Sequence, residues 1–400
     1  MIDPQKVRKL TAHYAAAFAV YFCSFCMIRS FISVYLLDRG FSYTQVGIIS
    51  AIHMLFSALI QPNYSLILNR FPRLTLRRFM IIGFLPAVLC SLVTFVLPSK
   101  MIFFIPLYIL FGLLVIGQQS LMVSLGMEYV NAGVPINPGF GRGIGSVGYA
   151  AANLLLGTLI VRYGSSVSHV INIVMLLILV LLLATLPDAS SFGETVREDE
   201  TSHETSDNIG VFLRVNNNFT MFILSVVLIF FGHSIVNTYM PDVVKQFGLG
   251  SDFAGAMNGL AAVLELIPMM FYLRISKKIS PLNMLKIAAV FFFIKILTAA
   301  LARNAAGIAF SQSMQLLAYA TFAMSSIYFT NQAVKPRNRV MAQGLLVGAN
   351  ETGFTIGSLV SGIVLDHTTI RTLLWIGVAV TAIGSVLMLT AIEKFQDSGK

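Results

Sequence analysis

The sequence predicts an all-α membrane protein with about twelve transmembrane helices in two pseudo-symmetric six-helix bundles. Three observations support this fold class. Of the 400 residues, 56% are hydrophobic and only 11% are charged, a composition outside the range of soluble globular chains. The apolar residues form runs of about 20, long enough to cross roughly 30 Å of hydrocarbon as helices. One polar, acidic segment divides the chain near its middle.

The apolar runs give the order of the predicted spans. They cover residues 11–37, 47–64, 79–97, 101–127, a helix that begins near Arg142, 170–186, 219–236, 254–273, 284–302, 305–330, 340–365 and 372–392. The first run is too long for the apolar part of a cleavable signal, so it is predicted to be the first helix. Lys and Arg gather at the termini and in the even-numbered connections, which places both termini in the cytoplasm.

The polar segment over residues 187–210 is rich in Ser and Thr, and it contains many acidic residues but only one Lys or Arg, namely Arg197. Such a segment cannot pack a core. The sequence therefore predicts an N-terminal six-helix bundle over 1–186, an acidic cytoplasmic linker over 187–210 and a C-terminal six-helix bundle over 211–400. A basic loop follows the second helix of each half. These similarities suggest a parallel internal repeat, the plan of transporters that rock two bundles about a central site.

Residues 141–149 read GRGIGSVGY and contain the G-x-G-x-x-G spacing of a dinucleotide-binding loop. That site needs a preceding strand and an acidic residue about 20 positions later. Here a Pro-rich turn precedes the segment and an apolar helix without that acid follows it, so a phosphate site is not expected. The small residues Gly141, Gly145, Gly148 and Ala152, repeated by Gly353, Gly357 and Ser361, indicate either plain close packing of helices or a sliding interface between the halves.

Two short stretches carry a resemblance to a known family. Residues 47–62 include Gly47-Ile48-Ile49, Leu55-Phe56-Ser57 and Gln61-Pro62, and residues 140–149 read FGRGIGSVGY. In these residues the chain resembles the major facilitator superfamily, and within it the lactose-permease-like oligosaccharide:proton symporters. The topology resembles the family over the whole chain, and the residues match well over 34–64 and 139–150. The resemblance implies that Arg142 binds the solute beside an aromatic platform at Tyr149, with Glu128 organising the same site.

The sequence also departs from that family at two places. The loop after the second helix carries Asn69 where the family usually has Asp. Residues 311–330 contain neither the histidine nor the acid that the permeases use for proton and sugar binding in their tenth helix. Proton coupling by that route is therefore not expected.

Charged side chains inside the predicted spans are candidate functional groups, because a central Arg, Lys or Asp costs about 2.5–3.5 kcal/mol to insert. Glu265 lies deep in its span and is predicted to carry a proton, with a structural salt bridge as the alternative. Lys295 is its natural counter-ion. Glu351 is expected to act either in the interior or at a gate. Arg29 is expected to face the interior, although its side chain is long enough to reach the membrane surface.

Uncharged polar side chains lie in the same helices. Hydroxyl-rich solutes need several donors and acceptors in a mostly apolar cleft, so the predicted binding residues also include Asn153, His233, Asn237 and Gln315. A lone amide in a membrane helix also serves as an interhelix hydrogen bond. No metal-binding, P-loop or catalytic constellation is visible in the sequence. We expect no enzyme activity, no cofactor and no metal.

The predicted function is secondary active transport of a small polar solute, with a sugar or glycoside favoured, by proton symport and alternating access. The alternatives are the same fold carrying a nucleoside, an organic anion or an exported drug, and a membrane receptor that does not transport. The expected partners are the solute, protons and the bilayer, and the chain is expected to be a monomer in the inner cell membrane. The net charge of +10 is assigned to cytoplasmic loops facing anionic lipid rather than to nucleic-acid binding.

Overall fold

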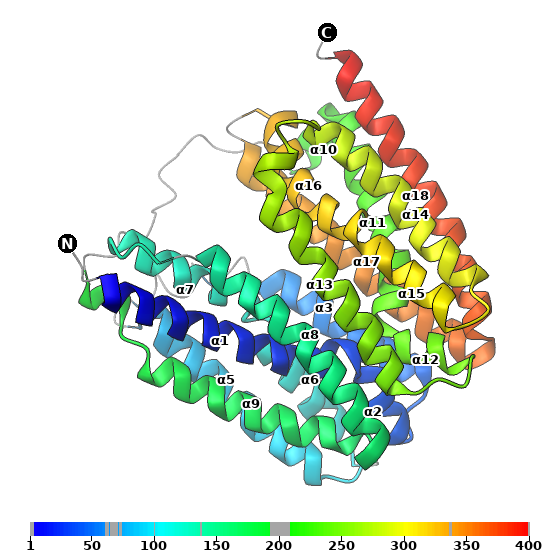
Figure 1. Ribbon diagram of the computed structural model, residues 1–400. Helices are drawn as coiled ribbons and strands as arrows, with labels where there is room; N and C mark the ends of the chain where they lie inside the picture. The colour runs from blue at the N-terminus through cyan, green and yellow to red at the C-terminus, as the bar shows by residue number, and fades with distance from the viewer. Residues whose placement is uncertain are drawn as a thin grey trace. The chain divides into compact units, whose positions relative to one another are not determined.

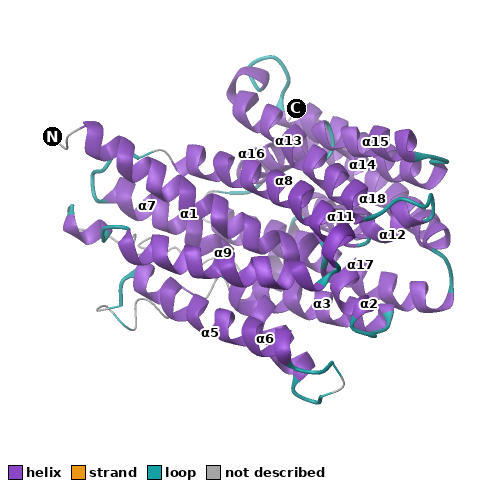
Figure 2. Ribbon diagram, turned by 60° about the horizontal axis from the view of Figure 1, so that its bottom comes forward, coloured by secondary structure: helices purple, strands orange, loops and turns teal. Residues whose placement is uncertain are grey.

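The computed structural model describes residues 4–60, 64, 71, 74–99, 101–136, 138–192, 209–335 and 338–398. In this part of the chain the regular structure is helical, with no strand (Figure 2). The chain divides into two compact units. Unit 1 is Met1–Phe41 with Ile52–Thr201, and unit 2 is Ser42–Ala51 with Ser202–Lys400. Most of the predicted acidic linker, together with Gln61, Pro62 and Asn69, lies outside the described residues.

Unit 1 is a bundle in which α1 packs against α8 and α9, and α5 packs against α6 and α9. Figure 1 shows these helices in chain order. Their bounds are α1 (Pro4–Ser30), α2 (Ile32–Asp38), α3 (Tyr43–Ile60, shared with unit 2), α5 (Leu76–Val96), α6 (Phe104–Ile116), α7 (Gln119–Asn131), α8 (Pro138–Tyr163), α9 (Ser166–Thr185) and the 3-10 turn η2 (Ala189–Ser191).

Unit 2 is a second bundle, in which α11 packs against α17 and α18, and α14 packs against α16 and α18. Its elements are α10 (Ile209–Val215), α11 (Asn217–Thr238), α12 (Met240–Lys245), α13 (Ser251–Ile275), α14 (Pro281–Leu301), α15 (Ala305–Ser313), the 3-10 turn η3 (Met314–Leu316), α16 (Tyr319–Ala333), α17 (Arg339–His367) and α18 (Ile370–Ser398).

Within the described residues, eight helical stretches are long and apolar enough to span a membrane. They correspond to α1, α5, α6 with α7, α8, α9, α11, α14 and α18. Large apolar side chains on these helices are exposed, including Leu89, Leu155, Leu181 and Val386. Such side chains suit a hydrocarbon environment rather than water. The structure confirms the predicted all-α membrane fold class.

The spans of the two units are interrupted at matching places. The first span of unit 1 breaks at Phe31, between α1 and α2, and the first span of unit 2 breaks at Tyr239, between α11 and α12. The fourth span of each unit is also broken, at Gly117–Gln118 in unit 1 and at η3 in unit 2. This agreement between the units is what a parallel repeat produces.

The two rows of small residues pack inside their own units. A Cβ atom on Gly141 would lie 2.3 Å from a ring carbon of Tyr14, and one on Gly148 would lie 2.9 Å from the Ala19 carbonyl oxygen. In unit 2, a Cβ atom on Gly353 would lie 2.6 Å from the Val227 carbonyl oxygen. The two rows therefore let α8 lie close to α1 in unit 1 and α17 lie close to α11 in unit 2, which is plain helix packing.

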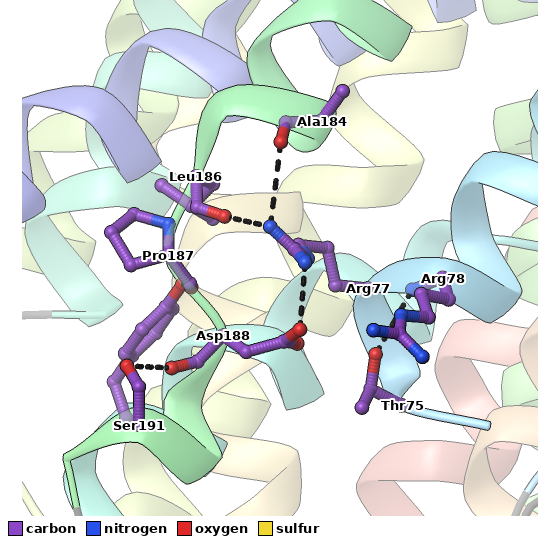
Figure 3. A network of polar contacts seen from close by, with 9 residues as sticks. Thr75, Arg77, Arg78, Ala184, Leu186, Pro187, Asp188 and Ser191 are labelled. Atoms are coloured by element: carbon purple, nitrogen blue, oxygen red, sulfur yellow. Dashed lines mark hydrogen bonds and ion pairs between the residues drawn. The ribbon is translucent and has the colours of Figure 1, made fainter. Parts of the chain in front are cut away.

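An arginine from α5 holds the end of α9 in unit 1 (Figure 3). The Arg77 guanidinium donates to the carbonyl oxygens of Ala184 and Leu186 and, at 2.6 Å, to the Asp188 carboxylate. Both charged side chains are largely buried. A cation at the carboxyl end of a helix satisfies its free carbonyls and complements the helix dipole. Arg77 thereby fixes the point where the chain leaves the bundle toward the predicted linker.

The amino end of α3 groups with unit 2 and is capped by a carboxylate from α17. Asp366 Oδ1 accepts from the Tyr43 N–H at 2.8 Å, and Oδ2 accepts from the Thr44 N–H at 2.8 Å. The Tyr43 hydroxyl donates to Asp242 at 2.7 Å. Burial alone would raise the pKa of Asp366, but hydrogen bonds from Thr44, Ser42 and Tyr43 outweigh it and hold the pKa below its usual value.

This cap predicts which change releases the amino end of α3. A carboxyl group with a lowered pKa stabilises the fold above the ordinary carboxyl value near 3.9, and this stabilisation is lost as the pH falls through the lowered value. Protection of the Tyr43 and Thr44 amides from hydrogen exchange should therefore not change between pH 8 and 5, once the intrinsic rate is corrected.

Asp366→Ala should speed exchange of these two amides about fivefold, because a lost N-cap costs about 1 kcal/mol. Asp366→Asn is the matched control, since Asn also caps helices well. Full protection in the Ala variant would show that the carboxylate does not hold this helix end.

Candidate functional site

Unit 2 brings three of the predicted site residues into one chain of hydrogen bonds. Lys295 on α14 donates from Nζ to Gln315 Oε1, and Gln315 Nε2 donates to Glu265 Oε1 on α13 at 2.6 Å. Lys295 and Gln315 are almost fully buried, at 3% and 2% exposed, while Glu265 is half-buried. The expected acid and base are thus joined through an amide that the sequence analysis assigned to substrate binding.

The local sequence explains why this amide reaches both partners. Gln315 stands in the 3-10 turn η3, which packs against α13 and α14, the helices that carry Glu265 and Lys295. Ser311, one turn earlier, donates from its hydroxyl to the Lys295 carbonyl oxygen at 2.6 Å and ties α15 to α14. An ammonium group only donates and a carboxylate only accepts. The amide therefore satisfies both with its oxygen toward Lys295 and its nitrogen toward Glu265.

A second group in unit 2 surrounds His233 on α11. Its ring stacks on Tyr319 of α16 with centroids 5.4 Å apart and an interplanar angle of 12°. Three phenylalanine rings make edge contacts with the His233 ring, namely Phe230, Phe292 and Phe354. Asn237, one turn later on α11, lies 3.0 Å from His233 Nε2. Flat aromatic faces beside an imidazole and an amide suit a ligand with both a ring and polar edges.

Glu351 lies on α17, three residues before Phe354, and is half-buried. Residues three apart share a helix face, so the carboxylate stands on the side of α17 that carries Phe354 toward His233. Glu351 therefore shares its face of α17 with a member of the aromatic group around His233.

In unit 1, the predicted residues Arg29, Tyr149 and Asn153 come together with one residue that the sequence analysis missed. The Tyr149 hydroxyl on α8 lies 2.7 Å from Ser30 Oγ on α1. The Arg29 guanidinium donates to Met54 Sδ and lies close enough to Tyr149 to act on its hydroxyl electrostatically. Asn153 donates to the Tyr149 carbonyl oxygen within α8 at 2.9 Å. Ser30 follows the charged Arg29 in sequence, which was the signal available for it.

Arg142 and Glu128 lie elsewhere in unit 1. Arg142 is exposed in the second turn of α8, seven residues before Tyr149, a separation of about 10 Å along the helix. Arg142 acts electrostatically on Tyr14 of α1. Glu128 is half-buried near the end of α7. The arginine and the aromatic platform that the resemblance assigns to one sugar site lie two turns apart on the same face of α8.

Several residues of these groups carry no separate signal in the sequence. Phe292 and Phe354 are ordinary apolar residues of membrane helices until the fold places them around His233, and Ser311 is an unremarked hydroxyl until it meets the Lys295 backbone. In the part of the chain that the structure describes, no group of three His, Cys, Asp or Glu residues could hold a metal ion.

Comparisons with known proteins agree with this architecture. A family model described as the MFS_1 like family matches residues 11–376. Two crystal structures of the nucleoside transporter NupG are similar, one of a point mutant at 15% identity and TM-score 0.79 and the other at 16% and 0.78. Each comparison covers 96% of this chain, and 99% and 98% of the NupG chains. A structure of the POT family transporter PepTSo gives a TM-score of 0.73 at 10% identity, covering 99% of both chains. No curated protein matches the sequence.

Proposed function

Because the chain belongs to the MFS_1 like family and is a membrane transporter of this type rather than an enzyme, we propose that it carries a small polar solute together with protons. The observation that supports coupling is the hydrogen-bond chain from Lys295 through Gln315 to Glu265. Ionisable groups are costly inside a membrane helix, and those that remain there often carry protons or bind substrate. The proposal includes alternating access in the cell membrane, with both termini on the cytoplasmic side.

The proposed solute is a sugar or glycoside. A sugar offers many hydroxyl groups, and unit 1 supplies Arg29, Ser30 and the Tyr149 hydroxyl within one group, with Phe22 and Phe25 beside the Tyr149 ring. Donors and acceptors set among aromatic rings bind hydroxylated rings well. The proposal also includes two further solute contacts, Arg142 near the start of α8 and Glu128 near the end of α7.

A second candidate solute is a nucleoside. Two observations favour it, namely the similarity to the nucleoside transporter NupG and the flat stack of His233 on Tyr319. A nucleobase stacks on aromatic faces, and the amide of Asn237 offers hydrogen bonds to a base edge. At 15–16% identity the similarity shows only the fold, so both solutes belong in one experiment.

The test is uptake into proteoliposomes under an imposed pH gradient. Purified protein is reconstituted and offered labelled neutral sugars, glycosides and nucleosides, with protein-free liposomes as the control. The proposal expects one solute class to accumulate above its external concentration and to dissipate the gradient as it enters. Downhill exchange without any effect of the gradient would reject proton coupling, and no uptake of either class would reject the proposed solutes.

Arg142→Lys tests the role that the resemblance assigns to this arginine. A guanidinium presents a planar fork of donors, whereas an ammonium is a point charge. Solute affinity should therefore fall about tenfold to a hundredfold, as expected when a bidentate contact worth roughly 1.5–3 kcal/mol is lost. The measurement is the concentration dependence of binding by thermal shift. Arg162→Lys, at the other end of α8, is the control, and unaltered affinity in the Arg142 variant would remove Arg142 from the solute site.

A further inference from the structure

The fourth span of each unit is broken near its middle, at corresponding points. In unit 1, α6 ends at Ile116 and α7 begins at Gln119. In unit 2, α15 ends at Ser313, the 3-10 turn η3 follows, and α16 begins at Tyr319. Interrupted helices have fewer backbone bonds to lose and are common where transporters bind and move. The side chains that hold each break decide how easily it changes shape.

The hydrogen bonds at the break in unit 1 come from uncharged groups. The titratable and charged neighbours are His53 of α3, which packs against Gly112 of α6, and Arg142 of α8, which acts electrostatically on Tyr14. From α1, the Tyr21 hydroxyl donates to the Val115 carbonyl oxygen at 3.1 Å, just before the break, and the Tyr14 hydroxyl donates to the Met122 carbonyl oxygen at 3.0 Å, just after it. Gln118, at the break itself, donates to the carbonyl oxygen of Leu114 near the end of α6 at 3.1 Å. Phenols and amides are neutral at physiological pH, so these bonds do not respond to a proton.

The break in unit 2 is held by charged groups instead. The glutamine at this break, Gln315, is fixed on one side by the Lys295 ammonium and on the other by the Glu265 carboxylate. Hydrogen bonds to an ionised group are roughly twice as strong as bonds between neutral groups. Protonating Glu265 turns one of these two strong bonds into an ordinary one. The same proton has no corresponding effect on Gln118.

The titratable groups on the surrounding elements leave Glu265 and Lys295 as the pair closest to the break. On α11 the titratable residue is His233, which faces Tyr319 of α16. On α17, which packs against α16, the acidic residue within the span is Glu351, three residues before Phe354. The segments α15 and η3 carry none. The other charged residues of α12, α13, α14 and α18 lie in the end turns of those helices or within two turns of an end, namely Asp242, Lys245, Asp252, Arg274, Lys286 and Arg371 with the last turns of α18.

We infer that Gln315 is a positioning residue that passes the protonation state of Glu265 and Lys295 to the backbone of the fourth span of unit 2. This break loosens when the pair gains a proton, while the corresponding break of unit 1 stays closed. The inference rests on the proposed proton coupling at the same pair. It adds that the proton acts on one unit only, through the helix break, and that Gln315 works by bonding to the pair rather than by binding solute.

Hydrogen exchange of the intact protein in lipid nanodiscs at pH 8 and pH 5.5 tests the inference. The amides to follow are Leu317 and Ala318, which bond to the Met314 carbonyl oxygen, against Gly117 and Gln118 in unit 1. After correction for the intrinsic rate, exchange at Leu317 and Ala318 should be about tenfold faster at pH 5.5, since local opening follows the bonds that hold a segment. Exchange at Gly117 and Gln118 should not change with pH.

Two variants and a matched control show whether Gln315 carries the effect. Gln315→Leu should remove the pH dependence at Leu317 and Ala318, and Gln118→Leu, at the corresponding break, should leave it intact. Glu265→Gln keeps a neutral amide in place of the carboxylate, so it should show the fast exchange at both pH values. This second variant tests the inference even when Gln315→Leu does not fold.

The inference is overturned when Leu317 and Ala318 exchange equally at both pH values, when Gly117 and Gln118 respond in the same way, or when Gln315→Leu keeps the full pH response. Uptake measured in parallel separates this inference from the proposed function. Proton-driven uptake without a pH response at the break rejects the role of Gln315 and keeps the proposed symport. A pH response at the break without proton-driven uptake rejects the proposed symport and still supports the role of Gln315 at the break.

Discussion

Proteoliposomes that contain the Glu265→Gln variant should lose uphill accumulation of solute and keep solute exchange. A gradient of one pH unit stores about 1.4 kcal/mol per proton, enough for about tenfold accumulation with one proton per solute. The variant should reach only a ratio of about one, because an amide cannot take up the proton, although it keeps the hydrogen bond with Gln315. The measurement is the ratio of internal to external labelled solute at steady state.

The control for this result is exchange of labelled for unlabelled solute across the same membranes without a gradient. Exchange needs binding and alternating access but no net proton movement. Glu393→Gln, in the last turns of α18, is the matched substitution outside the group. Uphill uptake in the Glu265 variant at the native ratio would contradict the proposed coupling role, and simultaneous loss of exchange would indicate a damaged fold instead.

Lys295→Met should destabilise the protein more than any other single change discussed for unit 2. Methionine matches the length and apolar character of the lysine stem, but it leaves Gln315 Oε1 and the Glu265 charge without their cationic partner. Removing one member of a buried ion pair in direct contact costs about 3–5 kcal/mol, and here Gln315 stands between the two charges. Because Glu265 is only half-buried, we expect a loss of roughly 2–3 kcal/mol, measured by thermal unfolding in detergent.

The double variant Lys295→Met with Glu265→Gln identifies the origin of that loss. With neither charge left, the double variant should recover at least half of the lost stability, because removing the Lys295 cation costs less once Glu265 no longer carries a negative charge. Equal losses in the single and double variants would place the cost in the packing of the lysine stem. Lys286→Met is the control, since Lys286 on the same helix is bonded to the Gln396 side chain rather than to an acid.

The fold class could be predicted from the sequence because the bilayer imposes a simple rule. A chain in hydrocarbon must satisfy its backbone bonds within each span, so long apolar runs become helices whatever their neighbours are. The eight candidate spans of the described residues lie where the apolar runs predicted helices. The breaks within the first and fourth spans had no such signal. Gly117 and Gln118 were read as part of one continuous span, and only packing shows the interruption.

The candidate site was predicted in its parts but not in its grouping. Glu265 and Lys295 could be singled out because a charge inside an apolar run is costly wherever it points. Gln315 was named as well, but as a solute-binding residue, because nothing in the sequence shows that its amide lies between Lys295 and Glu265. The expected grouping of Arg142 with Tyr149 came from resemblance and stays a prediction, since the two residues lie seven positions apart on one face of α8.

The amino-acid sequence alone predicts that this protein crosses a membrane many times as helices and that a few ionisable groups stay inside it. These properties follow from the transfer energies of single residues, which are local. Helix packing was needed to show that Gln315 joins Lys295 to Glu265, that the rows of small residues pack against α1 and α11, and that Asp366 caps α3. Each of these contacts joins residues from different helices, and in a membrane the apolar faces of helices are too alike for their pattern to specify which neighbours meet.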